Sequence, residues 1–188
     1  MKILQKIYFE IVKNVNKKKW KCMVNGCNED AINSHLLQQK GILNSITKAG
    51  HLIEVKMVDV FKWAKDKPVV EFKKVGITSA ISFPLYCNIH DTNLFKEIES
   101  HPVNFSAYST QLLLSYRAVC SELRKKQTQI EVFTRMLNSK TLEGNINPEF
   151  LESSIEGQSL GVVDINFYKE SLENEINNNQ NIFVFETY

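Results

Sequence analysis

The chain has 188 residues and a mass of 21.7 kDa, which suits one domain or a small domain with an appendage. A content of 43% hydrophobic and 10% aromatic residues is that of a globular protein and excludes a wholly disordered or fibrous chain. Its apolar runs end well short of the roughly 18 residues that a membrane-spanning helix needs, and charged residues interrupt the N-terminal apolar positions. We therefore expect a cytoplasmic protein with no membrane segment and no secretory signal.

Charge is divided unevenly along the chain, although the formal net charge is only +2. Residues 141–188 contain one lysine and nine acidic residues, a net charge of −8, which leaves +10 on residues 1–140. A basic body predicts an anionic partner such as nucleic acid, and an acidic end predicts a contact with protein or none. Solvated helix faces would give the same totals.

Two amphipathic helices are predicted in the first fifty residues. Apolar residues recur at helical spacing from Met1 to Val15. Ser34 is then placed to be the N-cap of a helix over Leu36–Thr47, with Gly50 as its C-terminal stop.

The next segment, from His51 to Tyr86, is rich in β-branched and aromatic residues. It predicts two or three antiparallel strands with a turn at Lys65–Pro68. A helix is expected to begin at Cys87 and to end near His101, which precedes a proline.

Two long helical segments follow, over Ser106–Leu137 and Pro148–Asn179, and their short polar connection predicts an antiparallel pair. The apolar run within Asn181–Tyr188 predicts a terminal strand. We therefore divide the chain into an α+β domain, residues 1–104, and an α-helical hairpin with a terminal strand, residues 105–188.

Most of the cysteines and half of the histidines fall into two clusters. In a reducing compartment such groups bind metal more often than they form disulfides, and thiolates with a neutral imidazole suit zinc. Cys22 and Cys27 flank a turn that contains Gly26, while Cys87 and His90 lie one turn apart at a helix start. We predict that these two pairs bind structural Zn²⁺, against the alternative of scattered buried cysteines.

A ligand pair from a turn and another from a helix N-terminus is the way in which a treble-clef zinc finger closes. About sixty residues separate the two pairs, so the helix and hairpin between Leu36 and Tyr86 must be an insertion in the metal core. The predicted fold is α+β, a zinc-stabilised treble-clef-like core with an inserted helix and β-hairpin, followed by the helical hairpin.

This pattern of ligands resembles that of HNH (His-Me finger) nucleases over about residues 20–101. The residues that carry the resemblance are a cysteine knuckle, a histidine several residues on, and a second ligand pair leading into a helix: Cys22, Cys27, His35, Cys87 and His90. The resemblance implies that His35 is a general base that activates water against a phosphodiester. It also implies a divalent cation, Mg²⁺ or Mn²⁺, near the closing helix, with Asp91, Asn93 or His101 as the residue that helps to hold it. Asp91 directly follows a predicted zinc ligand and is the best carboxylate for that cation.

Each of these two residues has other interpretations. An unperturbed histidine can accept a proton near neutral pH, but His35 would also serve as the fourth zinc ligand in place of His90 or make only local hydrogen bonds. Asp91 stands in the first turn of a helix, where an acidic residue offsets the helix dipole and caps free N–H groups.

A basic stretch leads into the knuckle and is the predicted nucleic-acid-binding surface. Lysines neutralise phosphates and an aromatic ring among them can stack on a base. Its residues are Lys17, Lys18, Lys19, Trp20 and Lys21. The other interpretation is a solvated helix end with a tryptophan packed on the domain.

The favoured hypothesis is a zinc-binding, HNH-like module that hydrolyses phosphodiesters in nucleic acid, as one subunit of a bacterial multi-protein system. The alternative is a non-catalytic zinc-binding adaptor whose helical hairpin binds a protein partner or a second copy. A third class is a DNA-binding regulator that uses the basic stretch alone.

Overall fold

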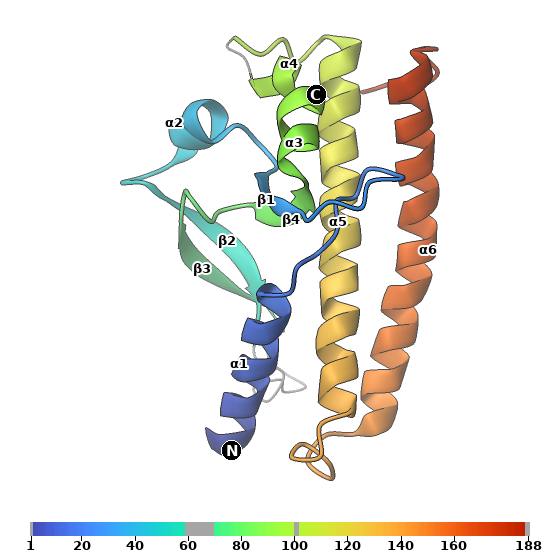
Figure 1. The fold of residues 1–188 in the computed structure, drawn as a ribbon. Coiled ribbons are helices and arrows are strands. Elements are labelled where there is room, and N and C mark those ends of the chain that lie inside the picture. Colours follow the sequence, from blue (N-terminus) through green and yellow to red (C-terminus); the bar gives the residue numbers. More distant parts are fainter. Residues whose placement is uncertain (1, 59–69, 100–101, 187–188) are drawn as a thin grey trace.

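A long antiparallel helical hairpin forms one side of the molecule in the computed structural model, which describes residues 2–58, 70–99 and 102–186 (Figure 1). Helix α5 spans Tyr108–Leu137 and α6 spans Pro148–Asn178, which confirms both predicted helices. Helix α6 begins sharply because Pro148 occupies its first turn and the Asn147 side chain accepts a hydrogen bond from the Glu149 N–H, at 2.9 Å.

The predicted N-terminal helix is also confirmed. Helix α1, Lys2–Asn16, packs beside α5 and directs its apolar stripe at the lower half of the hairpin (Figure 1). Its last turn buries Val15 fully among side chains of α5, α6 and the connection between them.

The predicted β-hairpin is present as β2, His51–Met57, paired antiparallel with β3, Val70–Gly76. The predicted turn at Lys65–Pro68 lies outside the described residues. The third strand, β4, Ser82–Tyr86, does not continue this sheet but pairs with β1, Ile32–His35.

The prediction of a capped helix over Leu36–Thr47 is wrong. Ser34 is a buried residue of strand β1, opposite Phe83 of β4, and not an N-cap. The chain then makes only a π-helical turn, η1, Gln39–Leu43, and one short turn, α2, Asn44–Ile46. Ser34 belongs to a strand because it pairs with Phe83, some fifty residues away, and the local sequence gives no sign of this pairing.

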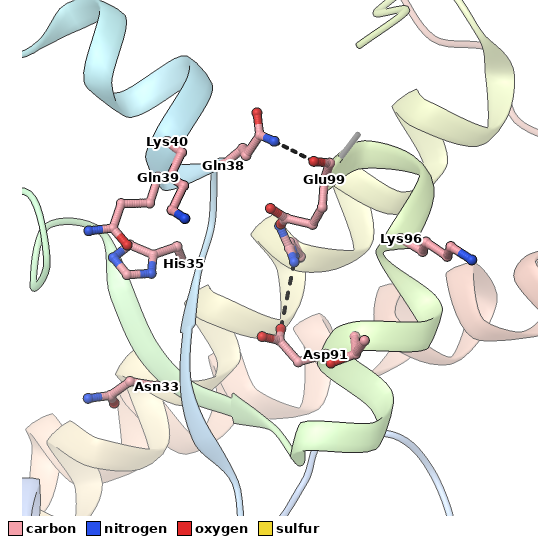
Figure 2. Close-up of a pocket in the computed structure, with 10 residues that line it drawn as sticks. Asn33, His35, Gln38, Gln39, Lys40, Asp91, Lys96 and Glu99 are labelled. Atoms are coloured by element: carbon pink, nitrogen blue, oxygen red, sulfur yellow. Dashed lines mark hydrogen bonds and ion pairs between the residues drawn. The ribbon is translucent and has the colours of Figure 1, made fainter. Parts of the chain in front are cut away.

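Strand β4 leads directly into α3, Asn88–Leu94, and then α4, Lys96–Glu99. The predicted helix is therefore present but broken at Phe95, and the expected end at His101 lies outside the described residues. Strand β1 runs up to the turn that carries Gln39, and α3 lies beside that strand (Figure 2).

Two apolar clusters hold the described elements together. The larger combines β4, α3 and α4 with α5 and α6, and Tyr86, Phe95 and Tyr116 are buried at its centre. The smaller joins α1 to the far ends of α5 and α6. The larger cluster thus takes residues from both sides of the predicted boundary at 104/105, and that boundary stays a prediction.

The predicted terminal strand is wrong over the described residues 181–186, which make no strand pairing. Asn179 and Asn181 both take the left-handed conformation, with φ of 51° and 57°, and redirect the chain after α6. Phe183 and Phe185 then pack against the larger cluster, and the Phe183 N–H donates to the Tyr108 hydroxyl at 3.2 Å. Side-chain burial, not strand pairing, fixes this segment.

None of the helices in the described residues combines the length and the apolarity that crossing a membrane requires.

Candidate metal centre and the adjoining pocket

The first ligand pair lies on a tight loop between α1 and β1. The Cys22 N–H donates to the Glu29 carbonyl at 2.9 Å, and the Cys27 N–H donates to the Val24 carbonyl at 3.1 Å. Gly26 takes a φ of +77°, which L side chains rarely adopt, at the turn between the two cysteines. These bonds fold the loop back on itself and bring both thiols to one side.

The second pair comes from the junction of β4 and α3. Cys87 is the extended N-cap residue of α3, with a ψ of 164°, and His90 follows within the first turn. The Met23 N–H donates to the Leu85 carbonyl at 2.8 Å and so fastens the first loop to β4. The strand positions the helix start directly under the loop.

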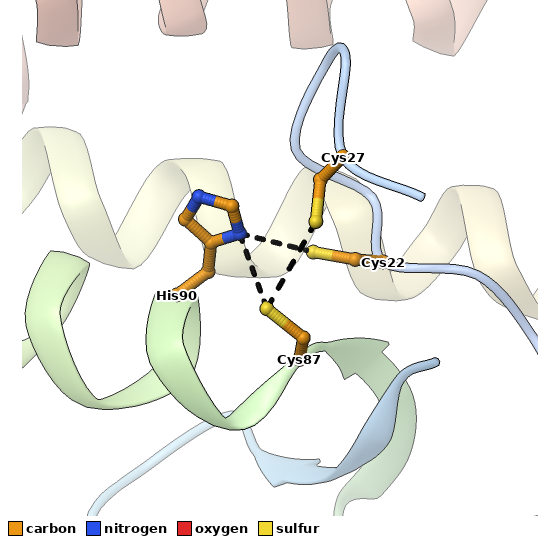
Figure 3. A group of neighbouring side chains, drawn as sticks. All are labelled: Cys22, Cys27, Cys87 and His90. Atoms are coloured by element: carbon orange, nitrogen blue, oxygen red, sulfur yellow. Dashed lines mark hydrogen bonds between the residues drawn. The ribbon is translucent and has the colours of Figure 1, made fainter. Parts of the chain in front are cut away.

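The four predicted ligands lie next to one another, with their side chains directed toward the same space (Figure 3). Their donor atoms all lie within 4.8 Å of one another. The His90 Nδ1 is 3.4 Å from the Cys22 Sγ and 3.3 Å from the Cys87 Sγ, and the sulfurs of Cys27 and Cys87 are 4.0 Å apart. Tetrahedral zinc with ordinary bond lengths places two sulfurs about 3.8 Å apart and a sulfur and a nitrogen about 3.6 Å apart. The spacing and the soft donor set therefore fit Zn²⁺.

The two buried thiols differ in acidity. Burial raises the pKa of the Cys22 thiol to about 11. Burial also opposes ionisation of Cys87, but hydrogen bonds from the His90 backbone N–H and from the other two thiols outweigh it, and its pKa is lowered. A helix N-terminus stabilises a thiolate in this way. Cys87 thus gives up its proton to a cation more readily than Cys22 does.

A buried ion pair on α6 clamps the cysteine loop. Lys169 is 4% exposed, and its Nζ lies 2.8 Å from the Glu173 carboxylate and donates to the Asn25 Oδ1 at 2.9 Å. The Asn25 N–H donates in turn to the Glu173 Oε1 at 3.1 Å, which also accepts from the Tyr116 hydroxyl at 2.5 Å. Since Asn25 lies between the two cysteines, the helical hairpin positions half of the candidate metal centre.

A pocket of about 600 Å³ opens beside the metal centre, between β1, η1 and the α3–α4 segment (Figure 2). Both residues that the sequence singled out for catalysis line it. The lining residues are Asn33, His35, Gln38, Gln39, Lys40, Asp91, Thr92, Lys96, Glu99 and Arg117.

The structure places His35 in this pocket and not in the metal cluster. It is the last residue of β1, is half-buried, and its Nε2 lies 3.3 Å from the Ile77 carbonyl. The fourth donor beside the three thiols is the imidazole of His90. The alternative in which His35 replaces His90 as the fourth ligand is therefore not the arrangement in this structure.

Asp91 directly follows His90 and points into the pocket from α3 (Figure 2). Its surroundings are unusual for a carboxylate. Burial raises its pKa, and the Ser34 hydroxyl and the Arg117 guanidinium offset only part of this effect. The nearest Arg117 nitrogen is 3.6 Å from the Asp91 Oδ1.

Sequence reasoning missed Arg117, which is 2% exposed and forms the back of the pocket. Its Nη1 donates to the Glu99 carboxylate at 2.6 Å, and its guanidinium lies over the Phe95 ring, 4.0 Å from the centroid. The signal was present, because Arg117 interrupts the buried stripe of α5 between Leu113 and Cys120. A charged residue on an apolar helix stripe indicates a buried partner.

The predicted nucleic-acid-binding residues are mostly engaged within the chain. Lys18 pairs with Glu131 at 2.7 Å, and Lys21 and Lys19 pair with Asp30 at 2.8 and 3.6 Å. The Trp20 ring is half-buried in the smaller apolar cluster, with Lys18 on it at 4.6 Å. Exposed Lys17 completes the stretch. These contacts match the interpretation of a packed tryptophan more closely than that of a free stacking platform.

Comparison with protein-family models, with curated proteins and with solved structures finds no significant match to this chain.

Proposed function

We propose that the Cys3His cluster is a structural zinc centre of treble-clef type, and that the adjoining pocket carries out HNH-like, metal-dependent phosphodiester hydrolysis on nucleic acid. The observation that supports this is the position of His35 and Asp91, which come from different elements yet line the same pocket. The zinc ligands fix the start of α3, and Asp91 directly follows one of them.

The residues of the pocket have distinct roles in this proposal. The His35 imidazole accepts a proton from the attacking water. Asp91 would hold Mg²⁺ or Mn²⁺, which stabilises negative charge on the leaving oxygen when bound. Lys40 and Lys96 line the same pocket and attract the phosphate backbone.

The test is cleavage of supercoiled plasmid DNA and of single-stranded RNA in the presence of Mg²⁺ or Mn²⁺. We expect His35→Ala to lower the rate about a hundredfold or more, while the zinc content and the circular dichroism spectrum stay unchanged. The matched control is His51→Ala, which removes an exposed histidine of β2 that lies outside the pocket lining. Cleavage that His35→Ala leaves intact would refute the assignment of the base.

A second function, a non-catalytic zinc-binding adaptor, is favoured by one specific contact. Arg117 already places a positive charge beside Asp91, where a hard cation would have to bind. Under this alternative the wild-type protein cleaves neither the plasmid DNA nor the RNA. Electron paramagnetic resonance then detects the same Mn²⁺ binding, or the same lack of it, in the wild type and in Asp91→Asn. Zinc would then serve only to hold the fold and to present the hairpin.

A further inference from the structure

The outward face of α6 carries an apolar stripe that the described part of the chain leaves uncovered. Leu160, Val163 and Phe167 are 63%, 68% and 68% exposed. They stand at positions i, i+3 and i+7 and therefore lie along one side of the helix. Figure 1 shows α6 at the edge of the molecule, with α5 on its inner side. Large apolar side chains in a row on a surface helix are typical of a helix-binding face.

The charges around this stripe are of one sign. The exposed charged side chains of α6 on the same side are all acids: Glu149, Glu152, Glu156, Asp164 and Glu170. The lysine of this helix, Lys169, is buried and neutralised by Glu173 on the inner side. An apolar stripe with acidic margins is complementary to a helix that has an apolar stripe with basic margins.

The same charges argue against a second copy bound through this face. A symmetric dimer places the same patch on both chains in contact. Glu152 and Glu156 near one end of the stripe, and Asp164 and Glu170 toward the other, would then face acids of the second chain in either orientation. Like charges held close together in this way weaken association.

We propose that the outward face of α6 is a docking site for a basic amphipathic helix of a partner protein, with Leu160, Val163 and Phe167 as the apolar anchors. The site is independent of the hydrolytic proposal, because neither His35 nor Asp91 contributes to it. The sequence predicted only that the hairpin binds protein, whereas this site specifies the segment that binds and the kind of partner.

The test uses the full chain and a synthetic helical peptide of about three heptads, with leucine at the a and d positions and lysine at the flanking ones. Binding is measured by isothermal titration calorimetry. We expect Leu160→Ser with Phe167→Ser to weaken binding about tenfold or more, because both anchors lose apolar contact. Phe72→Ser is the matched control, since Phe72 is 78% exposed on β3, outside α6.

A second variant separates charge from apolar contact. We expect Glu156→Lys with Glu170→Lys to weaken binding about tenfold and to reduce its salt dependence, whereas Glu143→Lys, an exposed acid on the connection before α6, changes it less than about twofold. All of these positions are exposed, so the variants should fold.

Three results would overturn the proposal. The first is equal binding of a peptide with the same composition in scrambled order, which would indicate general charge attraction. The second is equal weakening by Phe72→Ser. The third is a concentration-dependent dimer in sedimentation velocity that Leu160→Ser with Phe167→Ser abolishes, since the face would then bind a second copy.

Discussion

Replacing Lys169 by methionine is expected to destabilise the protein far more than removing a surface lysine. Methionine matches much of the length of the side chain but leaves the Glu173 carboxylate, itself 8% exposed, without its cation. The carboxylate keeps its bonds from the Tyr116 hydroxyl and the Asn25 N–H. Breaking one side of a buried ion pair costs about 3–5 kcal/mol, a large part of the about 5–15 kcal/mol that ordinarily stabilises a domain.

The double variant Lys169→Met with Glu173→Gln gives the sharper comparison. A glutamine oxygen can accept from the same hydroxyl and N–H, so no uncompensated charge stays buried. We expect the double variant to recover most of the stability that the single variant loses. The matched surface control is Lys73→Met, because Lys73 pairs with Glu71 at 2.8 Å with both side chains about half exposed, and its removal should cost below about 1 kcal/mol.

The assay is equilibrium unfolding in urea with Zn²⁺ in excess, followed by far-ultraviolet circular dichroism. A competition with a chelator, run in parallel, reports metal affinity. Since Lys169 holds Asn25 between two of the ligands, we expect Lys169→Met to weaken Zn²⁺ binding about tenfold. A single variant that loses less than about 1 kcal/mol, or a double variant as unstable as the single one, would refute the assignment of a buried charge to this clamp.

Three further predictions concern two of the metal ligands and the smaller apolar cluster. Cys87→Ser should remove metal from the purified protein, against one zinc per chain in the wild type by elemental mass spectrometry, and should lower the melting temperature. Because burial raises the pKa of Cys22 to about 11, Zn²⁺ binding must release its proton, so the affinity measured by chelator competition should fall as the pH is lowered from 8 to 6. Leu151→Ala, at a 2% exposed position of the smaller cluster, should cost about 2–5 kcal/mol in urea unfolding, whereas Leu160→Ala, 63% exposed, should cost below about 1 kcal/mol.

The long helices and the ligand cluster were predictable because local signals determine them. The apolar period of 3.6 residues and the proline at the first turn of α6 place both hairpin helices to within two residues. The Cys3His cluster was predictable because thiols and imidazoles gather where a soft cation can bind, whatever the fold of the residues between them. Cys22 and Cys87 are 65 residues apart, yet the spacing within each ligand pair was sufficient to predict the cluster.

The short elements were not predictable because their partners are distant in sequence. The sequence around Ser34 indicates a helix cap unless the position of β4 is known. The run after Asn181 indicates a strand, although no strand of the described residues pairs with it. Arg117 and Lys169 were missed for a related reason. The apolar stripe around Arg117 indicates that this residue is buried, but only the positions of Glu99 and Glu173 show which partner each charge meets inside the molecule.

The Cys3His cluster, the pocket and the helical hairpin are held together by shared contacts. Asp91 takes its place from α3, whose start the predicted zinc ligands fix, while the Arg117 beside it comes from α5. The loop that carries the other two ligands is held by α6 through Lys169. The hairpin thus contributes to both parts of the arrangement, to the pocket through Arg117 and to the cysteine loop through Lys169. A partner helix on the outward face of α6 would bind the same helix that holds the cysteine loop through Lys169.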